Sequence, residues 1–148
     1  MVSSRGQCKG CLATFVERKT RFYVAIKMND RTKDSMFLAI SSLYNTLTSK
    51  LLKTFTVDCG KEFACSEQVE AEFGIPMYFA DAYAAWQRGS NENSNGLLRQ
   101  FFPKKTDLAK VTLDKLTEAL MLINNRPRKC LGFKTPFDMF KHEIRKLI

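Results

Sequence analysis

Few residues in this 148-residue chain are of the kinds that mark fibrous, low-complexity or membrane-spanning proteins. Seven glycines and four prolines are too few for a collagenous or low-complexity chain. No apolar run approaches the roughly 20 residues needed to cross a bilayer. The chain also starts without an apolar signal core behind a basic end. We therefore expect neither secretion nor a role at a membrane.

Acidic residues are scarce as well, with 15 Asp and Glu against 24 Lys and Arg, which gives a net charge of +9. A small domain this basic is attracted to polyanions, of which nucleic acid is the commonest. Hydrophobic residues at 45% allow a buried core, and the length suits one domain over residues 1–148. DNA binding is the first functional expectation, with a solvated basic surface as the alternative.

One histidine and five cysteines limit the metal sites and disulfides that the chain can form. Cys8 and Cys11 have zinc-knuckle spacing, but Cys59 and Cys65 are too far apart to be the second pair. An odd, scattered set does not indicate a disulfide framework. Reduced thiols in a cytoplasmic protein are the simpler interpretation. His142 is expected on a terminal helix, without a ligand role.

Hydrophobic periodicity predicts a strand hairpin followed by alternating helices and strands. The expected strands cover residues 12–17, 22–28, 54–58 and 77–80. The expected helices cover residues 32–48, 66–73, 90–102 and 113–125, with a last one from residue 136. Helix termini are expected at N-cap residues Thr32 or Asp34 and Ser90, and at the stop Gly74. This order predicts an α/β fold, a mixed sheet with helices on both faces.

Two carboxylates stand where such a fold places catalytic groups. Asp58 ends a short strand, and Glu92 lies in the opening turn of a helix. Loops at the carboxyl ends of strands bind ligands in α/β folds, and carboxylate oxygens suit Mg²⁺ or Mn²⁺. Two such ions about 4 Å apart can activate a hydroxyl and stabilise a leaving oxygen in phosphodiester chemistry. Taken singly, Asp58 could equally be a turn former and Glu92 a favourable helix charge.

Three nearby residues have structural interpretations. Asp81 follows the next strand, and we expect it to stabilise that strand end rather than bind metal. Glu62 is expected to orient the backbone after Asp58, with a spare metal ligand as the alternative. Trp86 is expected to anchor its loop in the core, with stacking on DNA as the alternative.

Two segments, DCGKEF at residues 58–63 and WQRGSNENSNGLLRQFFPKKT at residues 86–106, carry a family resemblance. They resemble the catalytic core of bacterial insertion-sequence transposases, of the insertion-sequence family numbered thirty. This group is retroviral-integrase-like and has a D,D,E triad. Residues 12–21 and 124–136 extend the resemblance over nearly the whole chain. It implies a ribonuclease-H-like fold that cleaves and transfers DNA strands.

The resemblance also implies roles and partners. Asp58 matches the second catalytic aspartate and Glu92 the catalytic glutamate, so both would hold two Mg²⁺ or Mn²⁺ ions. The implied partners are the DNA ends of an insertion sequence, target DNA, and a second copy or an intact transposase. The implied location is the cytoplasm, at the nucleoid.

The family's first aspartate has no counterpart in this sequence. Its Trp-Glu-x-Asp context would place it about two residues before Met1, so the central first strand is expected to be truncated. The family's N-terminal helix-turn-helix region is also missing. We therefore expect this chain alone to be inactive. The open alternatives are a non-catalytic DNA-binding remnant and a ribonuclease-H-like nuclease.

A basic face for DNA is predicted beside the carboxylates. Glu92, Asn95, Gly96 and Arg99 recur at three- and four-residue steps, which places them on one helix face. Leu97, Leu98, Phe101 and Phe102 on the other side are expected in the core. The DNA contacts are expected from basic and amide side chains, most of them to phosphates: Arg88, Asn95, Arg99, Lys104, Lys105, Arg126, Arg128 and Lys129.

Overall fold

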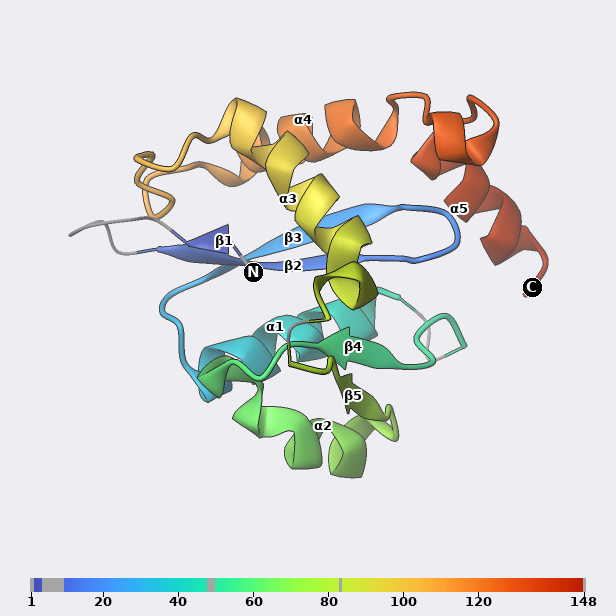
Figure 1. Ribbon diagram of the computed structural model, residues 1–148. Helices are drawn as coiled ribbons and strands as arrows, with labels where there is room; N and C mark the ends of the chain where they lie inside the picture. The colour runs from blue at the N-terminus through green and yellow to red at the C-terminus, as the bar shows by residue number, and fades with distance from the viewer. Residues whose placement is uncertain (1, 4–9, 48–49, 83, 148) are drawn as a thin grey trace. The chain divides into compact units, whose positions relative to one another are not determined.

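The computed structural model of the chain describes residues 2–3, 10–47, 50–82 and 84–147. The chain divides into two compact units (Figure 1). The first unit consists of Met1–Lys27 together with Ser90–Ile148, and the second consists of Met28–Gly89. Helices and strands alternate after an initial hairpin, as the sequence predicts.

The sheet of the first unit contains β1 (Val2–Ser3), β2 (Cys11–Val16) and β3 (Tyr23–Met28), in that order. β1 pairs antiparallel with β2, with Val2 opposite Leu12. The β-branched and aromatic residues of β2 and β3 favour extended backbone. Both strands lie within one residue of their predicted bounds. The strands β4 and β5 of the second unit form a separate two-stranded sheet.

The basic turn between β2 and β3 is fixed by one glutamate. The backbone N–H of Glu17 donates to the carbonyl of Phe22 at 2.8 Å, which closes the hairpin. The Glu17 carboxylate accepts from the backbone N–H groups of Lys19 (3.0 Å) and Thr20 (2.5 Å). A side chain thus satisfies turn N–H groups that have no strand partner, and the predicted hairpin is confirmed.

Three helices complete the first unit: α3 (Gly89–Phe101), α4 (Leu113–Asn124) and α5 (Pro136–Arg145). The hydroxyl of Thr112 caps α4, and that of Thr135 caps α5, by accepting from a backbone N–H three residues later. None of the helices in the described ranges has the length and hydropathy of a bilayer-spanning segment.

The prediction that Ser90 caps α3 is wrong. The 3₁₀ helix η2 (Ala85–Arg88) runs directly into α3, and Gly89 between them is already helical at φ −53° and ψ −34°. An N-cap needs an extended residue before the first turn, and no such residue is present here. The Ser90 hydroxyl instead accepts a hydrogen bond from the Arg21 guanidinium of the hairpin turn.

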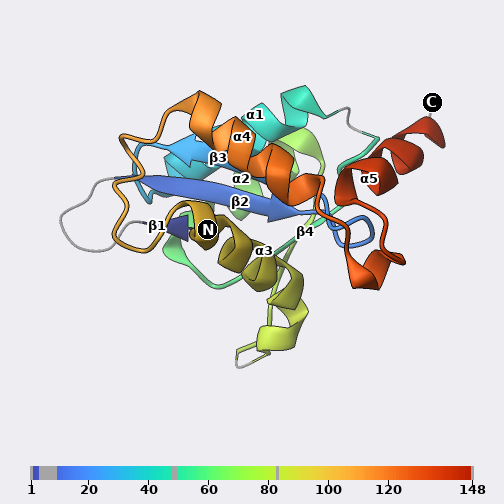
Figure 2. The same ribbon diagram turned by 90° about the horizontal axis from the view of Figure 1, so that it is seen from above.

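The core of the first unit lies between its sheet and the helices α3 and α4, which Figure 2 shows from above. Leu98 and Phe102 of the predicted apolar side are buried, whereas Phe101 is 41% exposed and does not belong to the core. Each fully buried leucine contributes about 1.5–3 kcal/mol relative to an exposed one. The buried cluster contains Val2, Leu12, Tyr23, Ala25, Leu98, Phe102, Leu108, Val111, Leu116, Ala119 and Ile123.

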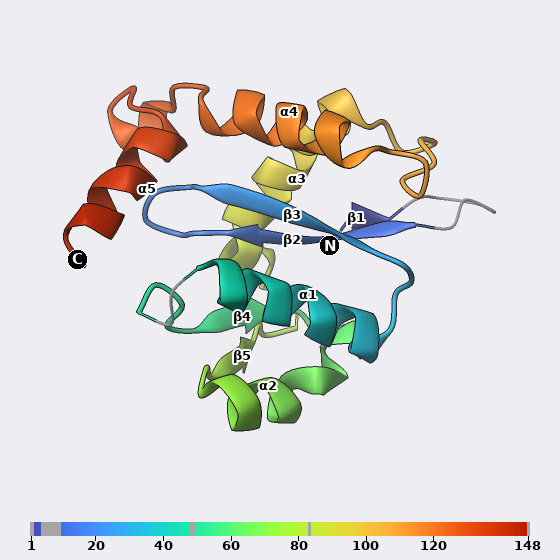
Figure 3. The same ribbon diagram turned by 180° about the vertical axis from the view of Figure 1, so that it is seen from behind.

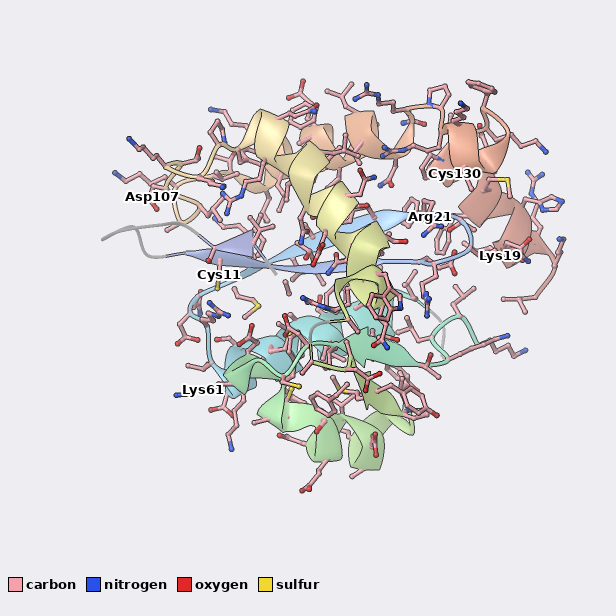
Figure 4. All side chains as sticks on the ribbon, in the orientation of Figure 1. Cys11, Lys19, Arg21, Lys61, Asp107 and Cys130 are labelled. Carbon is pink, nitrogen blue, oxygen red and sulfur yellow. The ribbon has the colours of Figure 1, made fainter. Side chains whose placement is uncertain are left out.

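The last helix, α5, packs against the hairpin turn through aromatic rings and an ion pair, and the ring of Phe22 also lies 6.5 Å from that of Phe137. The rings of Phe22 and Phe140 are stacked, with centroids 4.2 Å apart. The Lys19 ammonium lies 2.6 Å from the Glu143 carboxylate, and Figure 4 marks Lys19 at this end of the molecule. The Lys146 ammonium reaches the other Glu143 oxygen at 3.0 Å. Glu143 is thus held between two cations.

Acid is expected to weaken this contact. The hydrogen bond from Lys19, and then that from Lys146, lower the pKa of Glu143 from 4.5 to about 2. Because the folded chain favours the ionised carboxyl, the stabilisation is complete above pH 4.5 and is lost as the pH falls through about 2. A carboxyl-carbon NMR titration should place the Glu143 midpoint near 2. Lys19→Met should raise that midpoint more than Lys146→Met, and equal shifts would contradict the assignment.

The second unit contains α1 (Lys33–Thr46), β4 (Phe55–Val57), α2 (Ser66–Phe73) and β5 (Met77–Phe79). β4 and β5 are parallel, in a register that places the first residues of the two strands opposite each other. The bounds of α2 are those predicted. Its stop is also confirmed, because Gly74 has φ +65°, a left-handed conformation that costs glycine little.

The predicted N-cap of α1 is confirmed at Thr32, whose hydroxyl accepts from the backbone N–H of Ser35 at 3.2 Å. α1 and α2 lie side by side (Figure 3), joined by aromatic rings. The ring of Phe73 on α2 lies 5.7 Å from that of Phe37 and 4.6 Å from that of Tyr44, both on α1. These ring contacts join α1 to α2 within the second unit.

Candidate functional site

Two aspartates lie at the same edge of the β4–β5 sheet. Asp58 follows β4 directly, and Asp81 comes two residues after the end of β5. The pairing of the strands continues past their ends, since the N–H of Ala80 donates to the carbonyl of Val57 at 2.7 Å. Because the strands are parallel, their carboxyl ends coincide. The structure therefore confirms that both aspartates fall at strand ends.

The Asp58 carboxylate is paired with Arg88. Its Oδ2 atom accepts from Arg88 Nη1 at 2.6 Å, and its Oδ1 atom accepts from the backbone N–H of Gly60 at 3.2 Å. The Asp58 side chain is 42% exposed and that of Arg88 is 26% exposed. The ion pair is thus reached by solvent, which screens it. Arg88, predicted to contact DNA phosphate, contacts the candidate catalytic carboxylate in this structure.

Asp81 closes the loop that leads to α3. Its backbone N–H donates to Gln87 Oε1 at 3.0 Å, and Gln87 Nε2 donates back to Asp81 Oδ2 at 2.9 Å. This agrees with the expected structural role of Asp81. The expectation that Trp86 anchors the loop in the core is wrong, because its side chain is 79% exposed. The reciprocal pair of Asp81 and Gln87 ties this loop instead.

Glu62, four residues after Asp58, is buried at 3% exposure. It lies in the 3₁₀ helix η1 (Lys61–Cys65), and its Oε1 atom accepts from Arg31 Nη2 at 3.2 Å. A Cβ atom on Gly60 would lie 2.7 Å from the Glu62 carboxyl carbon. The carboxylate therefore packs directly against the backbone that follows Asp58, which supports the expected positioning role over that of a spare metal ligand.

Gly60→Ala is expected to destabilise the fold by about 1–3 kcal/mol, because the new methyl group overpacks against a buried carboxylate. The backbone of Gly60, at φ −67°, suits alanine, so the contact with Glu62 is the cause. The matched control is Gly96→Ala in α3, where a Cβ atom meets nothing within 4 Å. That variant should gain about 0.5–1 kcal/mol. Urea unfolding measures both, and a loss of stability in the control alone would contradict the prediction.

Glu92 is exposed in the first turn of α3, as predicted. Asn95, one turn later, is half-buried, and its Oδ1 atom accepts from the hydroxyl of Tyr23 at 2.7 Å. Burial raises the pKa of Tyr23, so the hydroxyl stays protonated and remains a donor. The Asn95 amide oxygen is therefore engaged in a hydrogen bond within the first unit.

Arg99, on the same face of α3, contacts backbone carbonyls. Its Nη2 atom donates to the carbonyl of Ser3 at 2.5 Å, and its Nη1 atom lies 3.4 Å from the carbonyls of Phe102 and Pro103. Phe102 and Pro103 directly follow α3, and carbonyls at the end of a helix lack helical partners. The guanidinium predicted to contact DNA thus links β1 to the end of α3.

The remaining predicted DNA contacts lie on two loops of the first unit. Lys104 and Lys105 are exposed after α3, and Arg126 and Lys129 are exposed after α4. Arg128 is half-buried, and its Nη2 atom donates to the carbonyl of Ile123 at 3.2 Å. Burial, and then the neighbouring Arg126, lower the pKa of Arg128.

In the part of the chain that the structure describes, no three His, Cys, Asp or Glu side chains are grouped to hold a metal ion. Cys11 and Cys65 are buried, and Cys59 and Cys130 are exposed. Cys8, the other half of the zinc-knuckle spacing, lies outside the described residues. His142 is exposed on α5, 3.6 Å from Glu143.

Comparison with curated proteins identifies the relatives of this chain, although no protein-family model matches it. The transposase InsI of insertion sequence IS30A from Escherichia coli K12 is 40% identical over 133 residues, 90% of this chain and 35% of that protein. The transposase of IS1086 from Cupriavidus metallidurans CH34 is 36% identical over 131 residues, 88% of this chain and 39% of that protein. The chain is a homologue of the IS30-type insertion-sequence transposases. It spans little more than a third of the length of these two relatives.

The chain has the fold of retroviral integrase cores. The catalytic core domain of BIV integrase matches 97% of this chain and 100% of its own length, with a TM-score of 0.69 and 18% identity. The HTLV-2 integrase core in complex with magnesium matches 94% of this chain and 90% of its own length, with a TM-score of 0.65 and 18% identity. The predicted ribonuclease-H-like α/β fold is confirmed.

Sequence reasoning missed the residues that hold the carboxylates of the candidate site in place. Arg31 holds Glu62, and Gln87 holds Asp81, but neither partner is signalled by spacing. Tyr23 falls in a strand pattern that predicts only burial. Gln87 lies in the segment over residues 86–106 that carries the family resemblance, but that resemblance does not indicate what its side chain contacts.

Proposed function

We propose that this chain is the catalytic segment of a transposase that cleaves and transfers DNA strands at the ends of an insertion sequence. The observation that supports it is the half-exposed Asp58 carboxylate directly after the parallel strand β4. This placement occurs in a homologue of insertion-sequence transposases whose fold is that of integrase catalytic cores. Asp58 and Glu92 are the proposed catalytic residues.

The donor set fits a hard divalent cation. Asp58 offers carboxylate oxygens at a solvent-accessible sheet edge, and Glu92 offers a carboxylate at an exposed helix start. We propose that the two residues hold Mg²⁺ or Mn²⁺, two ions in the intact enzyme. When bound, such ions activate an attacking hydroxyl and stabilise the leaving oxygen. The magnesium complex of the HTLV-2 integrase core supports this choice of metal.

The triad of this family needs a third carboxylate. Residues 1–148 contain no Trp-Glu-x-Asp segment, so the proposal assigns two of the three carboxylates to them. Asp81 is not proposed as the third carboxylate, because its backbone N–H and its carboxylate are both hydrogen-bonded to the side chain of Gln87. Glu62 is not proposed either, because it is buried against Gly60 and Arg31.

DNA is the proposed substrate, bound through the exposed basic loops of the first unit. Lys104, Lys105, Arg126 and Lys129 are the proposed phosphate contacts, and Arg88, Asn95, Arg99 and Arg128 are proposed as further DNA contacts. The proposed site of action is the bacterial nucleoid. The trimeric form of the HTLV-2 integrase core, a structural neighbour, supports the proposed self-association of this chain.

Paramagnetic broadening by Mn²⁺ tests the metal site without requiring catalysis. In ¹H–¹⁵N spectra of the full chain, substoichiometric Mn²⁺ should broaden the amide signals around both Asp58 and Glu92. Asp58→Asn or Glu92→Gln should each remove the broadening at both places, because either loss leaves too few ligands. Asp81→Asn is the matched control and should keep it. Broadening at one carboxylate only, or broadening that Asp81→Asn removes, would contradict the proposed pair.

A further inference from the structure

The turn after α4 holds a phenylalanine in an unfavourable conformation. The 3₁₀ helix η3 (Lys129–Leu131) is followed by Gly132 at φ +61° and Phe133 at φ +63°. Left-handed backbone is costly for a bulky residue, and glycine or asparagine would fit better. The Phe133 side chain is also 72% exposed, so it contributes little to the core.

The turn is closed by its own backbone, which fixes where Phe133 stands. The N–H of Arg128 donates to the carbonyl of Lys134 at 3.0 Å, and the N–H of Phe133 donates to the carbonyl of Arg128 at 2.9 Å. The Arg128 guanidinium joins the turn to the end of α4. Thr135, directly after the turn, caps α5. Figure 4 marks Cys130 in this connection between α4 and α5.

The same turn is strongly basic. Residues 126–134 contain four Lys or Arg and no Asp or Glu. Arg126, Lys129 and Lys134 of this turn are exposed, as is the phenyl ring of Phe133. Cations that contact phosphates and an aromatic ring that stacks on a base are the combination by which proteins bind single-stranded nucleic acid. Phosphates alone need no aromatic residue, and the bases of an intact duplex offer no free face.

We propose that the turn over residues 126–134 binds an unpaired or unstacked stretch of DNA, with the ring of Phe133 stacked on a base. Arg126, Lys129 and Lys134 contact the flanking phosphates. The inference rests on the proposed function for its partner, DNA, and adds the form of DNA that this loop recognises. A phenylalanine kept in a left-handed, exposed position is explained if its ring is used by a ligand.

Fluorescence anisotropy with a labelled oligo(dT) strand and a labelled duplex of the same length tests the proposal. Phe133→Asn removes the ring and suits left-handed backbone, so the fold is retained. Its affinity for the single strand should fall about tenfold or more, while its affinity for the duplex stays within about twofold. Phe133→Trp should restore single-strand binding. Phe137→Ala, which removes a half-exposed ring on α5, is the control and should bind as the wild type does.

The outcomes separate this inference from the proposed function. If the wild type binds DNA and Phe133→Asn changes neither affinity, or lowers both equally, the inference fails while the proposed function stands. If the wild type binds neither DNA, both fail. Sedimentation velocity decides whether Phe133 contacts a second copy instead. A wild-type dimer that Phe133→Asn converts to a monomer, with single-strand binding unchanged, would overturn the inference.

Discussion

Asn124→Ala is expected to lower the free energy of unfolding by about 2–5 kcal/mol. Asn124 is 5% exposed at the end of α4, and its amide is paired with the backbone of Tyr23 in β3. Its Oδ1 atom accepts from the Tyr23 N–H at 2.9 Å, and its Nδ2 atom donates to the Tyr23 carbonyl at 2.8 Å. β3 is an edge strand of its sheet, so alanine would leave two buried backbone groups unsatisfied.

The loss is large against a typical total stability of about 5–15 kcal/mol. Urea unfolding should show a lower midpoint with an unchanged slope. Asn125→Ala is the matched control, because Asn125 is exposed and its side-chain amide donates to the carbonyl of Met121, in its own helix. It should change stability by less than about 0.5 kcal/mol. Asn124→Asp, which keeps the acceptor and loses the donor, should also destabilise. Equal stability of Asn124→Ala and Asn125→Ala would contradict this account.

The affinity of the chain for duplex DNA is expected to fall about a thousandfold between roughly 50 and 200 mM salt, as for about six phosphate contacts. The physical reason is counterion release, since each Lys or Arg that neutralises a phosphate frees a condensed cation. The net charge of +9 and the exposed basic loops of the first unit support this number of contacts. Anisotropy titrations at several salt concentrations give the slope.

Two double variants test which lysines make the phosphate contacts. Replacing Lys104 and Lys105 with alanine should reduce the slope by about 1.8, since each lost contact removes about 0.9. Replacing Lys33 and Lys53, exposed lysines of the second unit, should leave the slope unchanged if the loops of the first unit carry the contacts. Salt-insensitive binding by the wild type, or equal slopes for the two pairs, would refute the assignment.

Local features of this fold could be predicted because their causes are local. The bounds of α2 follow from apolar spacing and from Gly74, which ends the helix. The start of α1 follows from the Thr32 hydroxyl, which needs only a backbone N–H three residues away. The strand-end position of Asp58 follows from a short β-branched run. Each of these depends on fewer than ten neighbouring residues.

Features that depend on distant partners could not be predicted. Ser90 has the chemistry of an N-cap, but η2 precedes it and Arg21 binds its hydroxyl. Arg99 belongs to a basic pattern, yet its guanidinium contacts the carbonyl of Ser3. The buried partner of Asn124 is an exception, because the helical pattern could have indicated it. It continues the four-residue steps of Leu116 and Leu120, so an amide at a buried helical position already indicated a buried partner.

The ion pair of Arg88 and Asp58 has a thermodynamic consequence. A cation that binds Asp58 Oδ2 displaces the Arg88 guanidinium, so the free energy of the ion pair opposes cation binding. An anion that draws Arg88 away removes this opposition. Linkage is reciprocal, so the factor by which the anion strengthens cation binding equals the factor by which the cation strengthens anion binding. Under the proposed function, polyanion and metal are therefore expected to be positively cooperative ligands of this carboxylate–guanidinium pair, each bound more tightly when the other is present.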